Sequence, residues 1–215
     1  MITKAKLAHA EAVLKEYAHD LPEFILGTGW FLTQDEHDSD QIKPIPDQPN
    51  LRGYLTELQH ERYVLTPKSR QMMVSWVTLA YLLAVVLIRK NQLVIVQTKR
   101  EDDVKNLLDL GRFMYDHLPK FLQTIRPRVK GPRSSELELK IKATDSRMWG
   151  IPQGADVIRS NTVSVLYSDE LDFQPEASAS IRAAMPSLIG GGQFIATSSP
   201  SLEGIMKQLI HGVKK

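Results

Sequence analysis

The sequence predicts an α/β protein: a mostly parallel sheet with helices on both faces. Two observations lead to this fold class. Short apolar runs typical of buried strands alternate along the chain with longer segments of helical periodicity. In addition, the run from Met72 to Ile88 contains only two polar residues, Ser75 and Thr78, as expected of a helix buried on all sides. Strands that alternate with helices form βαβ units, whose strands are parallel.

The composition is that of a globular protein. The chain has 215 residues, of which 42% are hydrophobic and 24% are charged, so it can enclose a large core in one domain. It has no cysteine, which excludes a disulfide scaffold and thiolate zinc sites, and its 6 histidines show no metal-ligand spacing. The formal net charge of +2 is too small to indicate a nucleic-acid partner by itself.

The sequence features of a membrane or secreted protein are weak. The N-terminal residues Met1–Lys6 lack the apolar core of a signal peptide. The apolar run Met72–Ile88 is at the lower limit of about 17 residues for a spanning helix. Because strand patterns lie on either side of it, we interpret this run as a helix buried against a sheet and expect no membrane association.

The first 50 residues are expected to form an N-terminal helix and a lid-like segment. Residues 4–19 have amphipathic periodicity, which Pro22 ends. Residues 27–50 combine glycines, an acidic cluster and prolines, a composition typical of a loop. This segment is a lid over the main domain or, by default, a mobile surface segment. The main domain then comprises residues 51–215.

The main domain is expected to alternate strands and helices. Its first elements are a helix at about 50–60, a strand at 62–66, the long apolar helix, a strand at Gln92–Thr98 and a helix that ends near His117. An irregular, basic segment at 119–132 precedes a hairpin, made of the alternating strand Glu136–Lys142 and a short strand at Arg147–Ile151. The last elements are a strand at 163–168, a helix at about 175–187, a strand at 193–197 and a helix at about 203–211.

A basic turn lies between the first strand of the main domain and the long apolar helix. The turn runs from Pro67 to Gln71 and supplies two cations, Lys68 and Arg70. Strand, turn and buried helix have the layout of a phosphate-binding loop, in which backbone N–H groups and the helix N-terminus hold an anion. The pattern G-x-x-x-x-G-K-[ST] is absent, but Ser75 lies in the first helical turn and offers a hydroxyl for Mg²⁺. Taken alone, the turn is equally interpretable as a charged surface loop.

Two adjacent acids, Asp169 and Glu170, follow the apolar strand that begins at Val163. In an open α/β sheet, ligands bind at the carboxyl ends of the strands. An aspartate there can hold Mg²⁺, and the neighbouring glutamate can polarise a water molecule for attack on a γ-phosphate. The alternative interpretation of this pair alone is a solvated loop start or a helix cap.

The strand Gln193–Thr197 ends in a hydroxyl-rich segment that Pro200 terminates. The hydroxyls of Thr197 and Ser198 can sense a γ-phosphate by hydrogen bonding. The plain alternative is a strand followed by a turn.

In combination, these motifs resemble the large terminase subunit of tailed bacteriophages, the motor that packages DNA into procapsids. The segment Lys68–Trp76 looks like the deviant Walker A motif of that family, whose recurring core is Ser-Arg-Gln. Val165–Glu170 looks like its Walker B motif with the catalytic glutamate, and Ala196–Ser199 looks like its coupling motif. The resemblance covers about residues 50–200 and implies an additional-strand, RecA-like P-loop NTPase fold.

The resemblance implies a role for each of these positions. The nucleotide-binding residues would be Lys68, Ser69, Arg70, Gln71, Met72, Met73, Val74, Ser75 and Trp76. Ser75 and Asp169 would bind Mg²⁺, Glu170 would orient the attacking water, and Thr197 with Ser198 would couple ATP hydrolysis to movement. The chain departs from the family pattern at Met73 and Val74, where many relatives have Gly-Lys.

An arginine supplied to the nucleotide of a neighbouring subunit is also implied by the resemblance. Arg159 is our first candidate for this catalytic role because it precedes the Walker B strand, and Arg147 is the second. Such an arginine would neutralise the charge that develops in the transition state. Supply from a neighbour requires a ring of subunits, which we expect to be a pentamer on the procapsid, with a monomer for the isolated domain.

The implied partners are double-stranded DNA, the portal protein and the small terminase subunit, in the host cytoplasm during virion assembly. Positive charge on Lys120–Arg147 can track DNA phosphates, although a solvated face explains it equally well. Gln48 and Gln59 are the candidates for an adenine contact. The nuclease domain of large terminases is missing from this chain, so we expect no nuclease activity.

Two other functions remain open from the residues alone. A helicase-like P-loop ATPase of superfamily 2 would have a second RecA-like domain, which this length does not accommodate. A degenerate P-loop module that only binds DNA or portal protein would show no ATP turnover, and the missing Gly-Lys is its best support.

Overall fold

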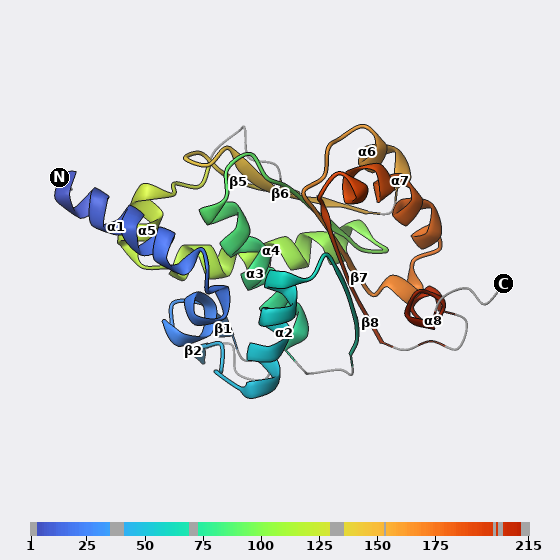
Figure 1. Ribbon diagram of the computed structural model, residues 1–215, viewed down its shortest axis with the longest axis horizontal. Coiled ribbons are helices and arrows are strands. Elements are labelled where there is room, and N and C mark those ends of the chain that lie inside the picture. The colour runs from blue at the N-terminus through green and yellow to red at the C-terminus, as the bar shows by residue number, and fades with distance from the viewer. Residues whose placement is uncertain are drawn as a thin grey trace.

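A six-stranded sheet forms the centre of the protein (Figure 1). The computed structural model describes residues 4–34, 41–68, 73–129, 136–152, 154–199, 201 and 204–211. The strand order is β3-β8-β7-β4-β6-β5, and all neighbouring pairs are parallel except β5 with β6. The strands are β3 (Tyr63–Pro67), β4 (Leu93–Gln97), β5 (Glu138–Ile141), β6 (Ser146–Ile151), β7 (Val165–Asp169) and β8 (Gln193–Ser198). The predicted fold class, a mostly parallel sheet, and the predicted hairpin at β5 and β6 are confirmed.

Both faces of the sheet are buried, as the continuous apolar runs require. Successive residues of a strand point to opposite faces. In β4, Val94 and Val96 belong to one hydrophobic cluster, whereas Ile95 belongs to the other. The same alternation separates Tyr167 from Leu166 in β7. Apolar side chains are therefore needed at every position of these central strands.

Helices cover each face of the sheet, in two groups (Figure 1). The first group is α2 (Pro49–His60), α3 (Val74–Ile88) and α4 (Glu101–His117), with α1 (Lys4–Tyr17) and α5 (Lys120–Ile125) beside them. The second group is α6 (Ala155–Arg159), α7 (Ala177–Ile189) and α8 (Ile205–His211), with the 3-10 turn η2 (Leu171–Phe173). Apart from α5 and α6, helices were predicted near these ranges and are confirmed, and α3 is the buried helix that the apolar run indicated. Among the helices of the described ranges, none has both the length and the apolar character to cross a membrane.

The segment before α2 packs into the same core as the first helix group. It contains a π-helical turn, η1 (Glu23–Gly27), and a small antiparallel pair, β1 (Leu32–Gln34) with β2 (Ile42–Pro44). Phe24 and Phe31 are fully buried, and Phe24 meets the Tyr17 ring at 5.4 Å between centroids. The segment is therefore packed against the helix layer, where η1 contacts α3 and β1 contacts α4.

Three predictions about irregular segments differ from the structure. Residues 27–50 were expected to be a loop but contain β1 and β2, and residues 119–132 were expected to be irregular but contain α5. The short helix α6 also lies in a stretch for which no element was predicted. Each of these elements has six residues or fewer, which is too short for hydrophobic periodicity to distinguish helix, strand and loop.

Candidate functional site

The three predicted motifs meet at one edge of the sheet. Since β3, β8 and β7 are parallel neighbours, their carboxyl ends lie side by side. Pro67 pairs with Ser198, and Asp169 pairs with Thr197. The backbone N–H of Lys68 extends this ladder by donating to the Ser198 carbonyl at 2.9 Å. The sheet itself therefore brings together residues that are more than 100 positions apart.

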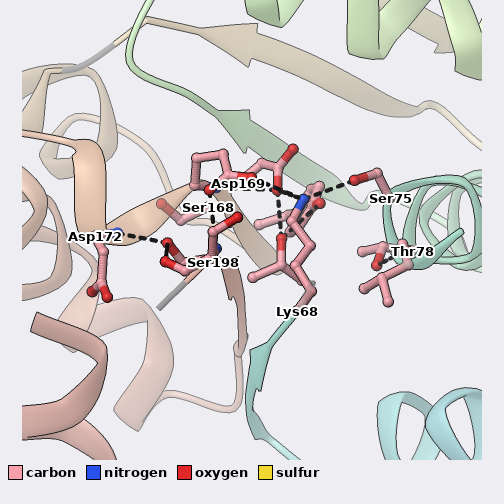
Figure 2. Close-up of polar contacts among 12 residues, drawn as sticks. Lys68, Ser75, Thr78, Ser168, Asp169, Asp172 and Ser198 are labelled. Carbon is pink, nitrogen blue, oxygen red and sulfur yellow. Dashed lines mark hydrogen bonds and ion pairs between the residues drawn. The ribbon is translucent and has the colours of Figure 1, made fainter. Parts of the chain in front are cut away.

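Lys68 is the central cation of this edge (Figure 2). Its Nζ lies 2.6 Å from Asp169 Oδ1 and donates to Ser75 Oγ at 3.0 Å. Glu170 Oε1 lies 3.4 Å from the same Nζ. Only 11% of the Lys68 and Asp169 side chains is exposed, so water screens this ion pair weakly. One ammonium group therefore contacts Asp169 and Ser75, the predicted metal-binding side chains, and Glu170, the predicted water-orienting one.

Asp169 is also held by its neighbour strand. Thr197 Oγ1 donates to Asp169 Oδ1 at 2.5 Å. Because that hydroxyl hydrogen is used, the Tyr167 hydroxyl, 3.1 Å away, is the donor to Thr197. Burial, together with the negative charge of Asp169, raises the pKa of Tyr167 well above its usual range, so the phenol keeps its proton. The result is a directed chain of hydrogen bonds from Tyr167 through Thr197 to the carboxylate.

Glu170 stands just past β7 in a left-handed backbone conformation, with φ 50° and ψ 48°. Its backbone N–H donates to Asp169 Oδ1 at 3.1 Å, and its Oε2 accepts from the backbone N–H of Ser199 at 3.1 Å. The side chain is 41% exposed, in contrast to that of Asp169. One oxygen of Glu170 thus faces Lys68 and the other is fixed by the segment after β8, while water can still reach the carboxylate.

Asp172 belongs to this edge as well, although it was not predicted. Its backbone N–H donates to Ser198 Oγ at 3.1 Å (Figure 2). Its carboxylate accepts from the N–H of Ser201 at 3.2 Å and from that of Met206, in the first turn of α8, at 2.7 Å. The predicted coupling residue Ser198 is therefore connected through Asp172 to the last described helix. No sequence signal distinguishes Asp172 from an ordinary loop acid.

The first turn of α3 completes the site. Position 74 holds a buried valine, and among the described residues of this loop Lys68 is the cation that reaches Asp169. Thr78 donates to the Val74 carbonyl at 2.7 Å, and the Tyr54 hydroxyl donates to Thr78 at 2.9 Å. Burial raises the pKa of Tyr54 to about 12, so this donor stays protonated. Met73, immediately before the helix, is left-handed with φ 55°.

The structure tests only some of the predicted nucleotide-binding residues. Ser69, Arg70, Gln71 and Met72 lie outside the described residues. The Trp76 ring packs edge-on against Phe113 of α4, with 5.9 Å between centroids, so its side chain belongs to the core between two helices.

The two candidate arginines lie apart from the Lys68 cluster. Arg159, at the end of α6, is 60% exposed and pairs with Asp156 of the same helix. Arg147 donates to Glu138 at 3.0 Å and lies over the Trp149 ring at 5.1 Å. Since Arg147 pairs with Leu93 at the start of β4, it lies at the amino edge of the sheet, opposite to Asp169.

The residues around Lys68 fit a small hard cation. A hydroxyl and a carboxylate are oxygen donors of the kind Mg²⁺ takes when phosphates complete its coordination. The Lys68 ammonium already lies between Ser75 Oγ and Asp169 Oδ1, so these two oxygens are close enough to share a cation. Within the described ranges, no group of three or more histidine and acidic side chains forms a metal site of its own.

The remaining sequence candidates have defined positions. Four of the basic side chains between Lys120 and Arg147 form ion pairs, namely Arg126, Arg128, Lys140 and Arg147. This neutralises much of the predicted positive face. Gln59, near the amino end of β3, accepts a hydrogen bond from the Leu21 N–H and donates one to the His19 carbonyl. Gln48 immediately precedes the first residue of α2 and is exposed.

The fold is that of large terminase ATPase domains. The HK97 bacteriophage large terminase matches 79% of the chain with a TM-score of 0.62 and 13% identity. The large terminase of a thermophilic bacteriophage matches 71% with a TM-score of 0.53 and 13% identity. A mutant ATPase domain of the Thermus phage P74-26 large terminase matches 65% with a TM-score of 0.51 and 18% identity.

At these identities the likeness concerns the fold. The chain spans 37% of the HK97 structure, 39% of that from the thermophilic bacteriophage and 60% of the P74-26 structure. No protein-family model and no curated protein sequence matches the chain.

Proposed function

We propose that this chain is the ATP-hydrolysing motor domain of a phage DNA-packaging terminase. The observation that carries this proposal is the meeting of Lys68, Ser75, Asp169 and Glu170 at the carboxyl edge of a sheet with the fold of terminase ATPase domains. The predicted Walker A, Walker B and coupling motifs would not meet there if they were unrelated loops. Fold similarity supports the class of motor, and the site geometry supports the reaction.

In this proposal the chain works mainly by positioning and electrostatics. Lys68, with Arg70 and the backbone of residues 69–74, binds the phosphates of ATP. Ser75 and Asp169 hold Mg²⁺, which supplies positive charge at the phosphates when bound. Glu170, the more exposed acid, orients the attacking water, and its fixed Oε2 keeps the other oxygen directed toward the Lys68 side. Thr197 and Ser198 couple the phosphate state to movement through Asp169 and Asp172.

We further propose that the chain moves double-stranded DNA as part of a ring, a pentamer on the procapsid, in contact with the portal protein and the small terminase subunit in the host cytoplasm. Arg159 would complete the site of the neighbouring subunit. We assign no nuclease activity to these residues.

The test is phosphate release from ATP by the wild type and by Glu170→Ala, with Mg²⁺ and double-stranded DNA present. Loss of a water-orienting carboxylate should lower kcat by about 10²-fold or more. Equal rates would remove Glu170 from the mechanism, and absence of turnover in the wild type would favour a module that only binds DNA or portal protein.

A further inference from the structure

A buried glutamine, Gln174, is bonded to the backbone that carries Glu170. Gln174 follows η2 and is only 5% exposed. Its Nε2 lies 2.7 Å from the Asp169 carbonyl oxygen and 2.9 Å from Ser168 Oγ. The Gln97 carbonyl oxygen, at the end of β4, lies 3.5 Å from the same nitrogen. This one amide group therefore reaches the ends of two neighbouring strands.

The orientation of the Gln174 amide is determined by its surroundings. Two of the three neighbours of Nε2 are carbonyl oxygens, which can only accept hydrogen bonds, so the NH₂ end must face them. Gln174 Oε1 is buried and has no hydrogen-bond partner among the described residues. The contacts of Gln174 with the loop are therefore made by its NH₂ group and not by its Oε1 atom.

The hydrogen bond to the Asp169 carbonyl fixes the peptide unit that leads into Glu170. The other side of this unit, the Glu170 N–H, is bonded to Asp169 Oδ1 at 3.1 Å. Glu170 has φ 50°, a left-handed conformation that is unfavourable for a residue with a side chain. Because both the carbonyl and the N–H of this peptide unit are hydrogen-bonded, the backbone retains the left-handed conformation. In this conformation the Glu170 carboxylate accepts a hydrogen bond from the Ser199 N–H.

A second link anchors Gln174 to the rest of the fold. Gln97, whose carbonyl it contacts, is 1% exposed and donates through Nε2 to Ser180 Oγ of α7 at 3.0 Å. Gln97 thus links the Glu170 loop to α7: its backbone carbonyl oxygen faces Gln174, and its side chain bonds to Ser180.

We propose that Gln174 is a positioning residue for Glu170: its amide holds the left-handed turn that presents the carboxylate to the site. This inference rests on the proposed function of Glu170 in ATP hydrolysis. Gln174 itself lies on the far side of the peptide and acts on the reaction only through the backbone.

The test replaces Gln174 by methionine, which has a similar length but no hydrogen-bond donor. In Gln174→Met, kcat for ATP should fall by about 10²-fold, as expected when a reacting group is displaced by about 1 Å, while the KM for ATP stays within about threefold. In a Glu170→Gln background the same substitution should lower the rate no further, because the two residues act as one unit. The matched control is Gln193→Met, since Gln193 Nε2 also donates to two carbonyl oxygens but at the opposite end of β8.

Hydrogen exchange of the Glu170 amide, followed by NMR, gives a reading that needs no turnover. Exchange should speed up by about tenfold or more in Gln174→Met and stay at the wild-type rate in Gln193→Met. If Gln174→Met lowers Tm but leaves both kcat and the Glu170 exchange rate unchanged, Gln174 is a packing residue and the inference is overturned. If the wild type does not hydrolyse ATP, the proposed function fails, and the exchange rates alone decide whether Gln174 holds the loop.

Discussion

Lys68 and Asp169 form an ion pair across an intervening strand. Their Nζ and Oδ1 atoms lie 2.6 Å apart although β8 separates β3 from β7 in the sheet. The ion pair thus spans the carboxyl end of β8, and Thr197 of β8 donates to the same carboxylate oxygen of Asp169. Lys68 Nζ has three hydrogens and already lies near oxygens of Ser75, Asp169 and Glu170, so a phosphate that binds it has to replace one of these contacts.

The first prediction concerns the nucleotide affinity of Lys68→Met. Removing a charged donor to phosphate costs about 1.5–3 kcal/mol, so the Kd for ATP should rise by about tenfold or more. Equilibrium binding of a fluorescent ATP analogue measures the change. Lys99→Met, which removes an exposed lysine two residues past β4, is the control and should leave the Kd unchanged. Indistinguishable affinities for the two variants would contradict the assignment of Lys68.

The second prediction concerns metal binding without nucleotide by the same Lys68→Met chain. In the wild type the ammonium lies between Ser75 Oγ and Asp169 Oδ1, so a divalent cation has to displace it. Without the ammonium, Mn²⁺ should bind about tenfold or more tightly, and electron paramagnetic resonance of free Mn²⁺ measures this. Unchanged Mn²⁺ affinity would show that Lys68 and the metal do not share these oxygens.

The third prediction follows from the backbone of Met73. A left-handed methionine at φ 55° is strained, whereas glycine adopts this conformation at little cost. Met73→Gly should therefore stabilise the chain by about 0.5–1 kcal/mol in urea unfolding. Asn91→Gly is the matched control: Asn91 has φ 56°, but asparagine tolerates this region, so its gain should be smaller. Equal gains would mean that methionine is no more strained in this conformation than asparagine, and destabilisation by Met73→Gly would mean that methionine contacts outweigh the strain.

The sequence was sufficient to predict the centre of the site because of how parallel sheets are built. Lys68, Asp169 and Thr197 each follow an apolar run, and the carboxyl ends of neighbouring parallel strands coincide. The strand pattern therefore predicts that these side chains lie near one another, whereas their proposed roles depend on the combination of the motifs. The strand order β3-β8-β7-β4 that makes the three residues neighbours comes only from the structure.

The supporting residues could not be predicted, because their roles depend on contacts that no periodicity encodes. Asp172 reaches backbone groups 29 and 34 positions away, and Gln174 reaches a carbonyl 77 positions away. Arg126 likewise pairs with Glu11, 115 positions earlier. In the sequence these are a loop acid, a loop amide and a basic residue, which are usually solvated.

The fourth prediction concerns the pH dependence of stability through Glu11. Hydrogen bonds from the Arg126 guanidinium lower the pKa of Glu11 below its ordinary value of 4.5. The ionised form is therefore favoured in the folded state, so its contribution is present above about pH 4.5 and is lost as the pH falls through the lowered pKa. Glu11→Gln should cost about 1–2 kcal/mol near pH 7, because the half-exposed carboxylate is partly screened by water, and less near pH 3.

Urea unfolding at several pH values measures this difference between Glu11→Gln and the wild type. Asp156→Asn is the control, since Asp156 is 95% exposed and its pair with Arg159 lies on one helix turn, so it should change stability little at any pH. A Glu11→Gln difference that stays constant from pH 7 to about pH 3 would contradict the stated origin of the pKa shift.

Arg159 and Arg147 differ in the free energy needed to break the contacts of their guanidinium groups. The Arg159 guanidinium is 60% exposed, and breaking its exposed pair with Asp156 costs about 0–1 kcal/mol. Arg147 would have to leave both Glu138 and the Trp149 ring. Arg159 is therefore better able to extend toward the nucleotide of a second subunit.

The last prediction is that Arg159 acts in trans. If each site takes Glu170 from one subunit and Arg159 from its neighbour, Arg159→Ala and Glu170→Ala chains are both inactive alone. A mixed assembly then contains interfaces in which an intact Glu170 faces an intact Arg159, so phosphate release should recover to a fraction of the wild-type rate set by the mixing ratio. Mixtures of Arg147→Ala with Glu170→Ala serve as the control. They should not exceed the rate of Arg147→Ala alone, because we expect that substitution to act on stability. Assembled rings that show no recovery with Arg159→Ala would reject Arg159 as the supplied arginine.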